Sequence, residues 1–202
     1  LKKMYPYFCT LHSLAYKCLR LESHEIMDEL DYIELGDMTG RKFVNKMKKG
    51  NGIDFSMPTA QSQYQDTINL AYAKYPNDKD RLPKIFKEVK LSDYGARSTI
   101  LQMDKDLTNF KRDRHKLEYV DYFNSFLECK NPPALKYLFI DEAQDLSAHQ
   151  WMVVDMIQQI SKPIETYVAG DDDQAIFRWA GADIEHFIKM ANDENNTIIP
   201  LT

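Results

Sequence analysis

The stretch Tyr137-Leu-Phe-Ile-Asp-Glu-Ala-Gln-Asp145 decides the fold class, because an apolar run ends there directly in adjacent carboxylates. Four apolar residues bounded by polar ones are typical of a short buried strand, here 137–140. A helix is expected over 147–160 with Ser147 as its N-cap, a second strand over 164–169, a helix over 183–191 and a third strand over 197–201. This alternation predicts an α/β domain with a parallel sheet and right-handed crossovers.

A second acidic stretch follows the second expected strand: Gly170-Asp-Asp-Asp-Gln174, continued by Phe177-Arg-Trp179 and Gly181. In parallel sheets, ligands bind beyond the carboxyl ends of the strands, which is where both acidic stretches fall. Gly170 permits a sharp turn, Gln174 can bond a phosphate oxygen or a water, and the aromatic-basic-aromatic run can stack on bases.

The acids also have a purely structural interpretation, in which they face the dipole of the helix that begins near Ser147. Likewise, Phe177 and Trp179 could be core residues and Asp171 to Asp173 a solvated turn. The chemical interpretation has Asp141 holding Mg²⁺ through oxygen and Glu142 orienting or deprotonating a water. Two such stretches at successive strand ends favour the chemical interpretation.

The rest of the chain has helical patterns. Thr10 can cap a helix with Leu11, Leu14, Ala15, Cys18 and Leu19 on one face. No strand pattern is evident over 23–131, where Tyr64 to Tyr75 suggest one amphipathic helix and Ile100 to Leu117 a longer one. The Gly50-Asn51-Gly52 turn and Pro58 separate helical stretches. We therefore expect a helical insertion within an α/β domain.

The charge distribution is uneven. The net charge is -5, but residues 136–202 hold 4 Lys and Arg against 12 Asp and Glu, which leaves residues 1–135 at +3. An acidic average speaks against nucleic acid as a partner, since phosphate binding needs cations. Two basic clusters remain open to interpretation as a solvated helix face or as a phosphate track. They are Arg41, Lys42, Lys46, Lys48 and Lys49, and Lys111, Arg112, Arg114 and Lys116.

Composition narrows the class of protein. A hydrophobic share of 44% with 7 Gly and 8 Pro is typical of a globular protein. No run approaches the ~18 apolar residues of a membrane span, so we expect no membrane partner and a cytoplasmic protein of bacterial or phage type. The three cysteines, Cys9, Cys18 and Cys129, indicate neither a disulfide framework nor a zinc site.

With these motifs in hand, the sequence resembles the UvrD/Rep/PcrA-like superfamily 1 (SF1A) helicases. Asp141-Glu-Ala-Gln-Asp145 resembles their motif II, Gly170 to Gln174 with Trp179-Ala-Gly-Ala182 resembles motif III, and Thr10-Leu-His12-Ser-Leu-Ala15 resembles motif Ib. The resemblance implies a partial RecA-like P-loop NTPase domain, 1A, at residues 1–22 and 132–202. It also implies a helical subdomain, 1B, inserted at 23–131.

Carried over residue by residue, the resemblance implies roles for three residues at an ATP site. Asp141 would hold the Mg²⁺ of bound ATP, Glu142 would activate the attacking water and Gln174 would sense the terminal phosphate. Phe177 and Trp179 would stack on bases, Arg178 would add a phosphate or cation–π contact, and Thr10 and His12 would lie near the strand's backbone. The implied partners are single-stranded DNA and junctions of single- and double-stranded DNA.

The chain also departs from the family pattern. Ala180 stands where many members have a second basic residue, and no GxxxxGK followed by Ser or Thr occurs, so the loop that cradles the phosphates is absent. We therefore expect a fragment of an ATP-dependent helicase, travelling 3′ to 5′ by resemblance, that is inactive alone. The alternatives are the helicase part of a recombination nuclease and a non-hydrolysing nucleic-acid-binding module. The pathway, the choice of DNA over RNA and the oligomeric state stay open.

Overall fold

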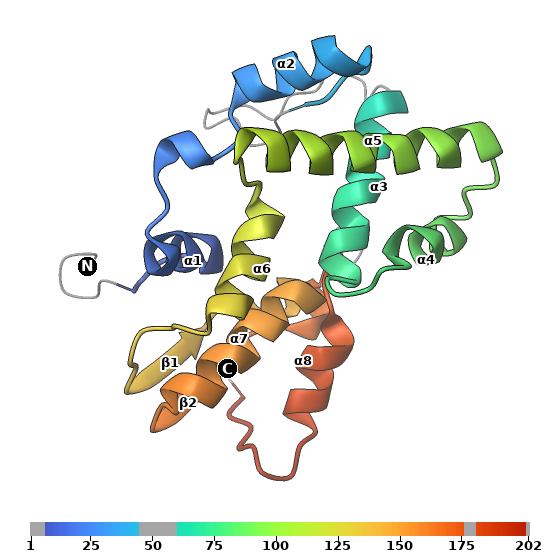
Figure 1. Ribbon diagram of the computed structural model, residues 1–202. Helices are drawn as coiled ribbons and strands as arrows, with labels where there is room; N and C mark the ends of the chain where they lie inside the picture. The colour runs from blue at the N-terminus through green and yellow to red at the C-terminus, as the bar shows by residue number, and fades with distance from the viewer. Residues whose placement is uncertain (1–6, 45–59, 176–180, 201–202) are drawn as a thin grey trace. The chain divides into compact units, whose positions relative to one another are not determined.

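The computed structural model describes residues 7–44, 60–175 and 181–200. Figure 1 shows a small parallel sheet and a series of helices. Contacts between Cα atoms divide the chain into two compact units. Unit 1 comprises Leu1–Arg20, Ala73–Asn77 and Tyr122–Thr202, and unit 2 comprises Leu21–Tyr72 and Asp78–Asp121. The expected α/β class with a mostly helical additional part is confirmed. Which residues form the expected subdomains 1A and 1B stays a prediction.

The sheet of unit 1 consists of β1 (Tyr137–Ile140) and β2 (Glu165–Val168), which pair in parallel. In their register Tyr137 lies opposite Glu165 and Ile140 opposite Val168. The two strands are joined through α7 (Ala148–Ser161), which begins at Ser147 with a capping box: the Ser147 hydroxyl accepts from the Gln150 N–H, and the Gln150 side chain accepts from the Ser147 N–H. Both strands and this helix were expected from the apolar runs and the cap.

One core cluster of unit 1 lies between the sheet and helices α7 and α8 (Ile184–Ala191). Trp151 is 1% exposed, and its ring stacks on the His186 ring of α8 with 4.4 Å between the ring centroids. Figure 1 shows α7 along the strands and α8 next to α7. The cluster consists of Ile140, Ala143, Trp151 and Val154, with Leu11, Leu138, Leu146, Val168, Phe187 and Met190 packed against it.

The expected third strand is wrong for its described residues. Residues 197–200 have no strand structure, and the part of the sheet that the structure describes has the order β1-β2. A strand needs a neighbour for its backbone groups and a surface for its apolar side chains. Ile198 and Ile199 have neither here, being 65% and 71% exposed. An apolar run alone therefore did not suffice to define a strand.

Two further helices belong wholly or mainly to unit 1. Helix α1 (Leu11–Leu19) begins at Thr10, whose hydroxyl accepts from the Ser13 N–H, and ends at Arg20 in the left-handed conformation. Its cap and its buried Leu14 and Ala15 confirm the expected helix. Helix α6 (Tyr119–Cys129) was not expected, and it contributes buried Phe123 and Phe126.

Unit 2 is helical in its described residues. Its elements are the short 3-10 helix η1 (Ser23–Glu25), α2 (Glu29–Thr39), α4 (Arg81–Glu88), α5 (Tyr94–Arg114) and most of α3 (Ala60–Lys74). Figure 1 shows α2 running along α5. The two helices expected here exist, with Ile68 and Ala71 buried on α3 and Ile100, Met103, Leu107 and Phe110 buried on α5.

The expected extension of α5 to Leu117 is wrong. The helix ends at Arg114 because His115 adopts the left-handed conformation, with φ of 53°, and its N–H bonds back to the carbonyls of Arg112 and Lys111. Leu117 instead forms a bridge with Ile26. The expected turn at Gly50-Asn51-Gly52 and the residue Pro58 lie outside the described residues. No helix in the described part of the chain is long and apolar enough to cross a membrane.

Candidate active site

The first expected site residues, Asp141 and Glu142, follow the last residue of β1 and are exposed. Glu142 has a left-handed backbone, with φ of 53° and ψ of 42°, and its N–H donates to Asp141 Oδ1 at 3.1 Å. The other described non-glycine residues with positive φ follow helix ends, whereas Glu142 precedes the 3-10 helix η2 (Ala143–Asp145). Such a backbone costs about 1–2 kcal/mol, and strain of this kind is concentrated at functional sites.

The end of β2 lies beside this turn. The Ala169 N–H donates to the Ile140 carbonyl at 2.8 Å, and the Ala143 N–H donates to the Ala169 carbonyl at 2.9 Å. These bonds extend the pairing of the strands beyond the sheet. The two acidic stretches, separated by more than twenty residues in sequence, therefore lie side by side, as expected for the ends of adjacent parallel strands.

A buried glutamine, for which the sequence predicted no role, connects the two strand ends. Gln144 in η2 is 1% exposed. Its Nε2 donates to Glu142 Oε2 at 2.7 Å, and its Oε1 accepts from the Asp171 N–H at 3.1 Å. The sequence signal is weak, because Gln144 stands among other polar residues, of which Asp141 and Glu142 are exposed.

Gly170 is needed for a reason other than the sharp turn that we expected. A Cβ at this position would lie 2.6 Å from Gln144 Oε1 and 2.9 Å from Phe187 Cζ. Its backbone φ lies outside the left-handed region. The absence of a side chain therefore lets the second strand end approach Gln144 closely.

Gln174, the third expected catalytic residue, lies in the 3-10 helix η3 (Asp172–Gln174) and is exposed. Its Nε2 donates to Asp171 Oδ2 at 2.6 Å, while Asp171 Oδ1 caps η3 by accepting from the Asp173 N–H at 3.0 Å. Through Asp171 and Gln144, a series of hydrogen bonds thus runs from Gln174 to Glu142.

The described side chains after the two strands are rich in carboxylates. Among the residues that the structure describes, no Lys, Arg or His forms an ion pair with Asp141, Glu142 or Asp171. Nearby, burial raises the pKa of Asp145, and the negative charge of Glu142 raises it further. A carboxyl whose pKa is raised by burial and by a neighbouring carboxylate is a candidate member of a functional site.

The N-terminal site residues lie on and before α1. Thr10 caps this helix. The His12 ring packs on the Phe123 ring of α6, with 4.2 Å between centroids and 33° between ring planes, and burial lowers the pKa of His12 to about 4. His12 is therefore neutral at pH 7, and its ring is packed against the Phe123 ring. A nucleic-acid contact by these two residues stays a prediction, and Phe177, Arg178 and Trp179 lie outside the described residues.

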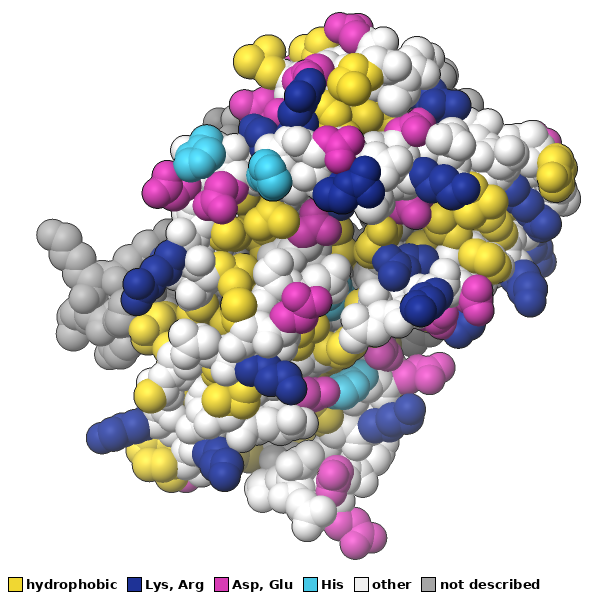
Figure 2. Space-filling view, in the orientation of Figure 1, with side chains coloured by type: hydrophobic (Ala, Val, Ile, Leu, Met, Phe, Trp, Pro, Cys, Tyr) yellow, Lys and Arg dark blue, Asp and Glu magenta, His cyan; other side chains and the backbone are white. Residues whose placement is uncertain are grey.

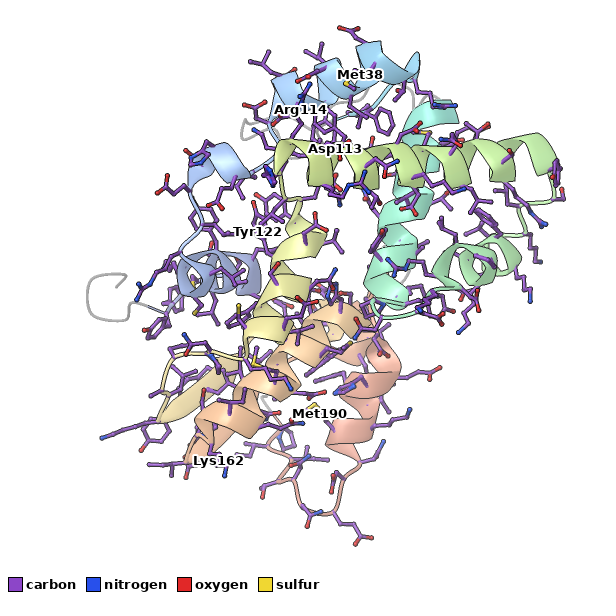
Figure 3. All side chains as sticks on the ribbon, in the orientation of Figure 1. Met38, Asp113, Arg114, Tyr122, Lys162 and Met190 are labelled. Carbon is purple, nitrogen blue, oxygen red and sulfur yellow. The ribbon has the colours of Figure 1, made fainter. Side chains whose placement is uncertain are left out.

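The second basic cluster serves unit 2 itself. Lys111 lies between Glu118 at 3.0 Å and Asp121 at 2.8 Å, and Lys116 lies 2.9 Å from Asp31. Arg114 pairs with Glu34 on α2, and Arg112 with Asp113. Figure 3 places Asp113 and Arg114 at the end of α5 next to α2, and Figure 2 shows acidic and basic side chains interspersed there.

Lys111 and Lys116 are largely covered by their ion pairs, with side chains 10% and 20% exposed. The side chains of Arg112 and Arg114 are 69% and 48% exposed, so a solvated helix face and a phosphate track both stay predictions for these two arginines. In the first cluster, Arg41 pairs with Asp106 at 2.6 Å. Lys46, Lys48 and Lys49 lie outside the described residues.

An α/β unit whose parallel strands end in adjacent carboxylates, without an ion-pair partner among the described residues, defines a candidate nucleotide-hydrolysing domain. Comparison with known proteins gives the family. The family model described as "UvrD/REP helicase N-terminal domain" matches residues 4–195. The chain therefore belongs to the UvrD/Rep-like helicase family, and its α/β unit is part of a RecA-like helicase domain.

Individual relatives agree with this family. ATP-dependent DNA helicase PcrA of Staphylococcus epidermidis is 24% identical over 196 residues, which are 91% of this chain and 25% of that protein. ATP-dependent DNA helicase Rep of Buchnera aphidicola subsp. Baizongia pistaciae is 37% identical over 62 residues, 31% of this chain and 9% of that protein. A probable DNA helicase II homologue of Rickettsia felis is 34% identical over 87 residues, 39% of this chain and 13% of that protein. The chain thus spans a quarter or less of these relatives.

Proposed function

We propose that this chain supplies the metal-binding and water-activating residues of an ATP-driven motor that translocates on single-stranded DNA and unwinds duplexes, in the 3′ to 5′ direction. The observation that carries the proposal is the joined pair of strand ends, where Glu142, Gln144 and the Asp171 backbone are hydrogen-bonded. Membership in a helicase family supports it. The relatives are several times longer, so the activity belongs to a protein that contains this chain together with a phosphate loop and a second motor domain.

The residues present fit ATP and Mg²⁺ by their chemistry. Mg²⁺ prefers oxygen ligands and is usually held by one or two carboxylates together with substrate phosphates and water. Asp141 offers an exposed carboxylate without a cation partner among the described residues, at the end of a strand that fixes its backbone. We assign binding of the metal to Asp141 and activation of the attacking water to Glu142.

Bound Mg²⁺ would neutralise charge on the phosphates, and ATP would supply the phosphoanhydride bond that is broken. The chain's own residues would do the rest. Glu142 accepts a proton from the water or orients it, since its carboxylate is exposed and held at one oxygen by Gln144. Gln174 is exposed and donates a hydrogen bond to Asp171. This arrangement supports a role for Gln174 in reporting the state of the terminal phosphate to the loop after β2.

The DNA-binding part of the proposal rests on the sequence motifs. Phe177 and Trp179 would stack on bases, Arg178 would contact a phosphate or an aromatic ring, and Thr10 and His12 would lie near the backbone of the strand. Stacking contributes about 1–3 kcal/mol per base regardless of sequence, which suits movement along arbitrary strands. Residues 1–22 and 132–202 would form subdomain 1A and residues 23–131 subdomain 1B.

The test is ATP turnover by the longer protein, measured with and without single-stranded DNA. Glu142→Gln should lower kcat by about 100- to 10,000-fold, because it removes the proposed general base while keeping the side chain's shape. Glu128→Gln, an exposed glutamate on α6, is the matched control and should leave kcat within about twofold, as expected for a surface residue away from the site. Undiminished DNA-stimulated turnover in Glu142→Gln would refute the proposed site.

A further inference from the structure

We infer that Gln144 is a positioning residue that fixes the carboxylate of Glu142 and ties it to the backbone of the second strand end at Asp171. This inference rests on the proposed function of Glu142. Both ends of the Gln144 carboxamide are used: Nε2 donates to Glu142 Oε2 at 2.7 Å and Oε1 accepts from the Asp171 N–H at 3.1 Å. Gln144 thus acts on the reaction through Glu142.

The chemistry of the two neighbours determines which residue type fits here. The Asp171 N–H requires an acceptor and the ionised Glu142 carboxylate requires a donor. A carboxamide offers both in a single planar group, and only one of its two orientations satisfies both neighbours. A glutamate at position 144 could accept the hydrogen bond from the Asp171 N–H, but its charge would repel Glu142. A methionine of similar length could neither accept from Asp171 nor donate to Glu142.

Burial makes this carboxamide a rigid connector. Gln144 is 1% exposed, so an unsatisfied polar end of its carboxamide could not turn to water and would be unfavourable. The close approach of Gly170, whose added Cβ would lie 2.6 Å from Gln144 Oε1, leaves the side chain little freedom on that side. Glu142, in contrast, is exposed and would otherwise sample several rotamers.

The position of Gln144 also gives the second strand end influence over Glu142. Asp171 receives Gln174 Nε2 on its side chain and offers its N–H to Gln144. A displacement of the loop at Asp171 therefore breaks or redirects the bond that holds Glu142. This is a direct physical route by which the state of the second acidic stretch reaches the water-activating carboxylate.

The experiment compares Gln144→Met and Gln144→Glu in the longer protein, with Gln159→Met on the exposed face of α7 as the matched control. Both Gln144 variants should lower kcat by about 10- to 100-fold, as loss of a supporting hydrogen bond does. The KM for ATP should stay within about threefold, since the residues that bind nucleotide are untouched. A loss confined to KM, or an unchanged kcat in both variants, would overturn the inference.

Hydrogen exchange at the Asp171 amide provides a readout that needs no nucleotide. Gln144→Met should speed this exchange by about tenfold or more, whereas Gln144→Glu should keep the amide protected because its oxygen still accepts. Equal exchange in Gln144→Met and wild type would show that the connection to Asp171 does not exist. The amides of α7 provide the folding control: if they stay protected in a Gln144 variant, unit 1 has folded and misfolding does not explain the effect.

The two proposals fail in distinguishable ways. Full turnover in Glu142→Gln, with the expected exchange at Asp171, would refute the proposed function and leave Gln144 as a structural connector without a catalytic effect. Loss of turnover in Glu142→Gln, with normal turnover in Gln144→Met and Gln144→Glu, would leave the proposed function intact and refute the positioning role.

Discussion

The two units of the chain use charged residues in opposite ways. In unit 2, several cations form ion pairs with carboxylates, most completely Lys111, whose side chain is 10% exposed between Glu118 and Asp121. In unit 1, the carboxylates that follow β1 and β2 have no ion-pair partner among the described residues. Three of them, Asp141, Glu142 and Asp171, lie in the two turns that Gln144 connects. The difference teaches that a count of charges indicates function poorly, whereas the pairing of charges separates residues that hold a fold from residues available to a ligand.

Lys111 gives the largest expected effect on stability. Burial alone would lower its pKa, but Glu118 and Asp121 outweigh burial and raise it above the ordinary value. Lys111→Ala would leave two carboxylates, 11% and 21% exposed, without a counter-charge and should destabilise unit 2 by about 3–5 kcal/mol. Urea denaturation measures this effect. Lys105→Ala, an exposed lysine on the same helix, should change stability by less than about 0.5 kcal/mol.

A loss of unfolding free energy below about 1 kcal/mol in Lys111→Ala would contradict the difference between the units, because exposed surface ion pairs contribute that much. It would mean that the charges of unit 2 are as replaceable as solvated ones.

His12 should make the stability of unit 1 depend on pH. Burial lowers its pKa from 6.5 to about 4, so between these values the unfolded chain binds a proton that the folded chain does not. Stability is therefore fully present above pH 6.5 and is lost as the pH falls toward 4, by at most about 3 kcal/mol. The measurement is the difference in thermal stability between wild type and His12→Phe from pH 7 to pH 4.

Wild type should lose more stability than His12→Phe over this range, while His24→Phe, in which an exposed histidine of unit 2 is replaced, should follow wild type. Identical pH profiles of wild type and His12→Phe would contradict the packing of the His12 ring against Phe123. A loss of single-strand affinity in His12→Phe without a change in stability would instead favour the nucleic-acid role.

Gly170→Ala should have a smaller effect, of about 1–3 kcal/mol, because its Cβ would meet Gln144 and Phe187 at less than 3.0 Å. The matched change in unit 2 is Gly95→Ala on α5, where the closest atom, Asp93 Oδ1, lies 3.3 Å away. That variant should stay within about 1 kcal/mol of wild type because alanine is the better helix former. Equal effects at the two glycines, measured by urea denaturation, would contradict the close approach at the strand ends.

Local signals explain what the sequence could reveal. The strand ending at Ile140 and the helix capped by Ser147 depend on an apolar run and on a side chain bonding its own backbone, both of which are visible in a few residues. Asp141 and Glu142 could be singled out as candidates for the same reason, since the two carboxylates are adjacent in the sequence.

Features that depend on distant partners could not be predicted in this way. The third strand failed because Ile198 and Ile199 have no neighbouring strand in the described structure. For Arg114 the sequence left a solvated helix face and a phosphate track open, because its ion-pair partner Glu34 is far away in sequence. Gln144 was missed for a related reason, because one of its two hydrogen-bond partners, Asp171, belongs to another strand end.

The central claim is that the carboxylates after β1 and β2, which have no ion-pair partner among the described residues, serve a bound cation, whereas the paired carboxylates of unit 2 do not. The most direct test of this claim is the Mg²⁺ dependence of ATP turnover in the longer protein. Asp141→Asn should raise the Mg²⁺ concentration needed for half-maximal turnover by about tenfold or more, since it removes an anionic ligand. Asp113→Asn, at the Arg112 pair on α5, should leave that concentration unchanged. Identical Mg²⁺ dependence in wild type and Asp141→Asn would contradict the account.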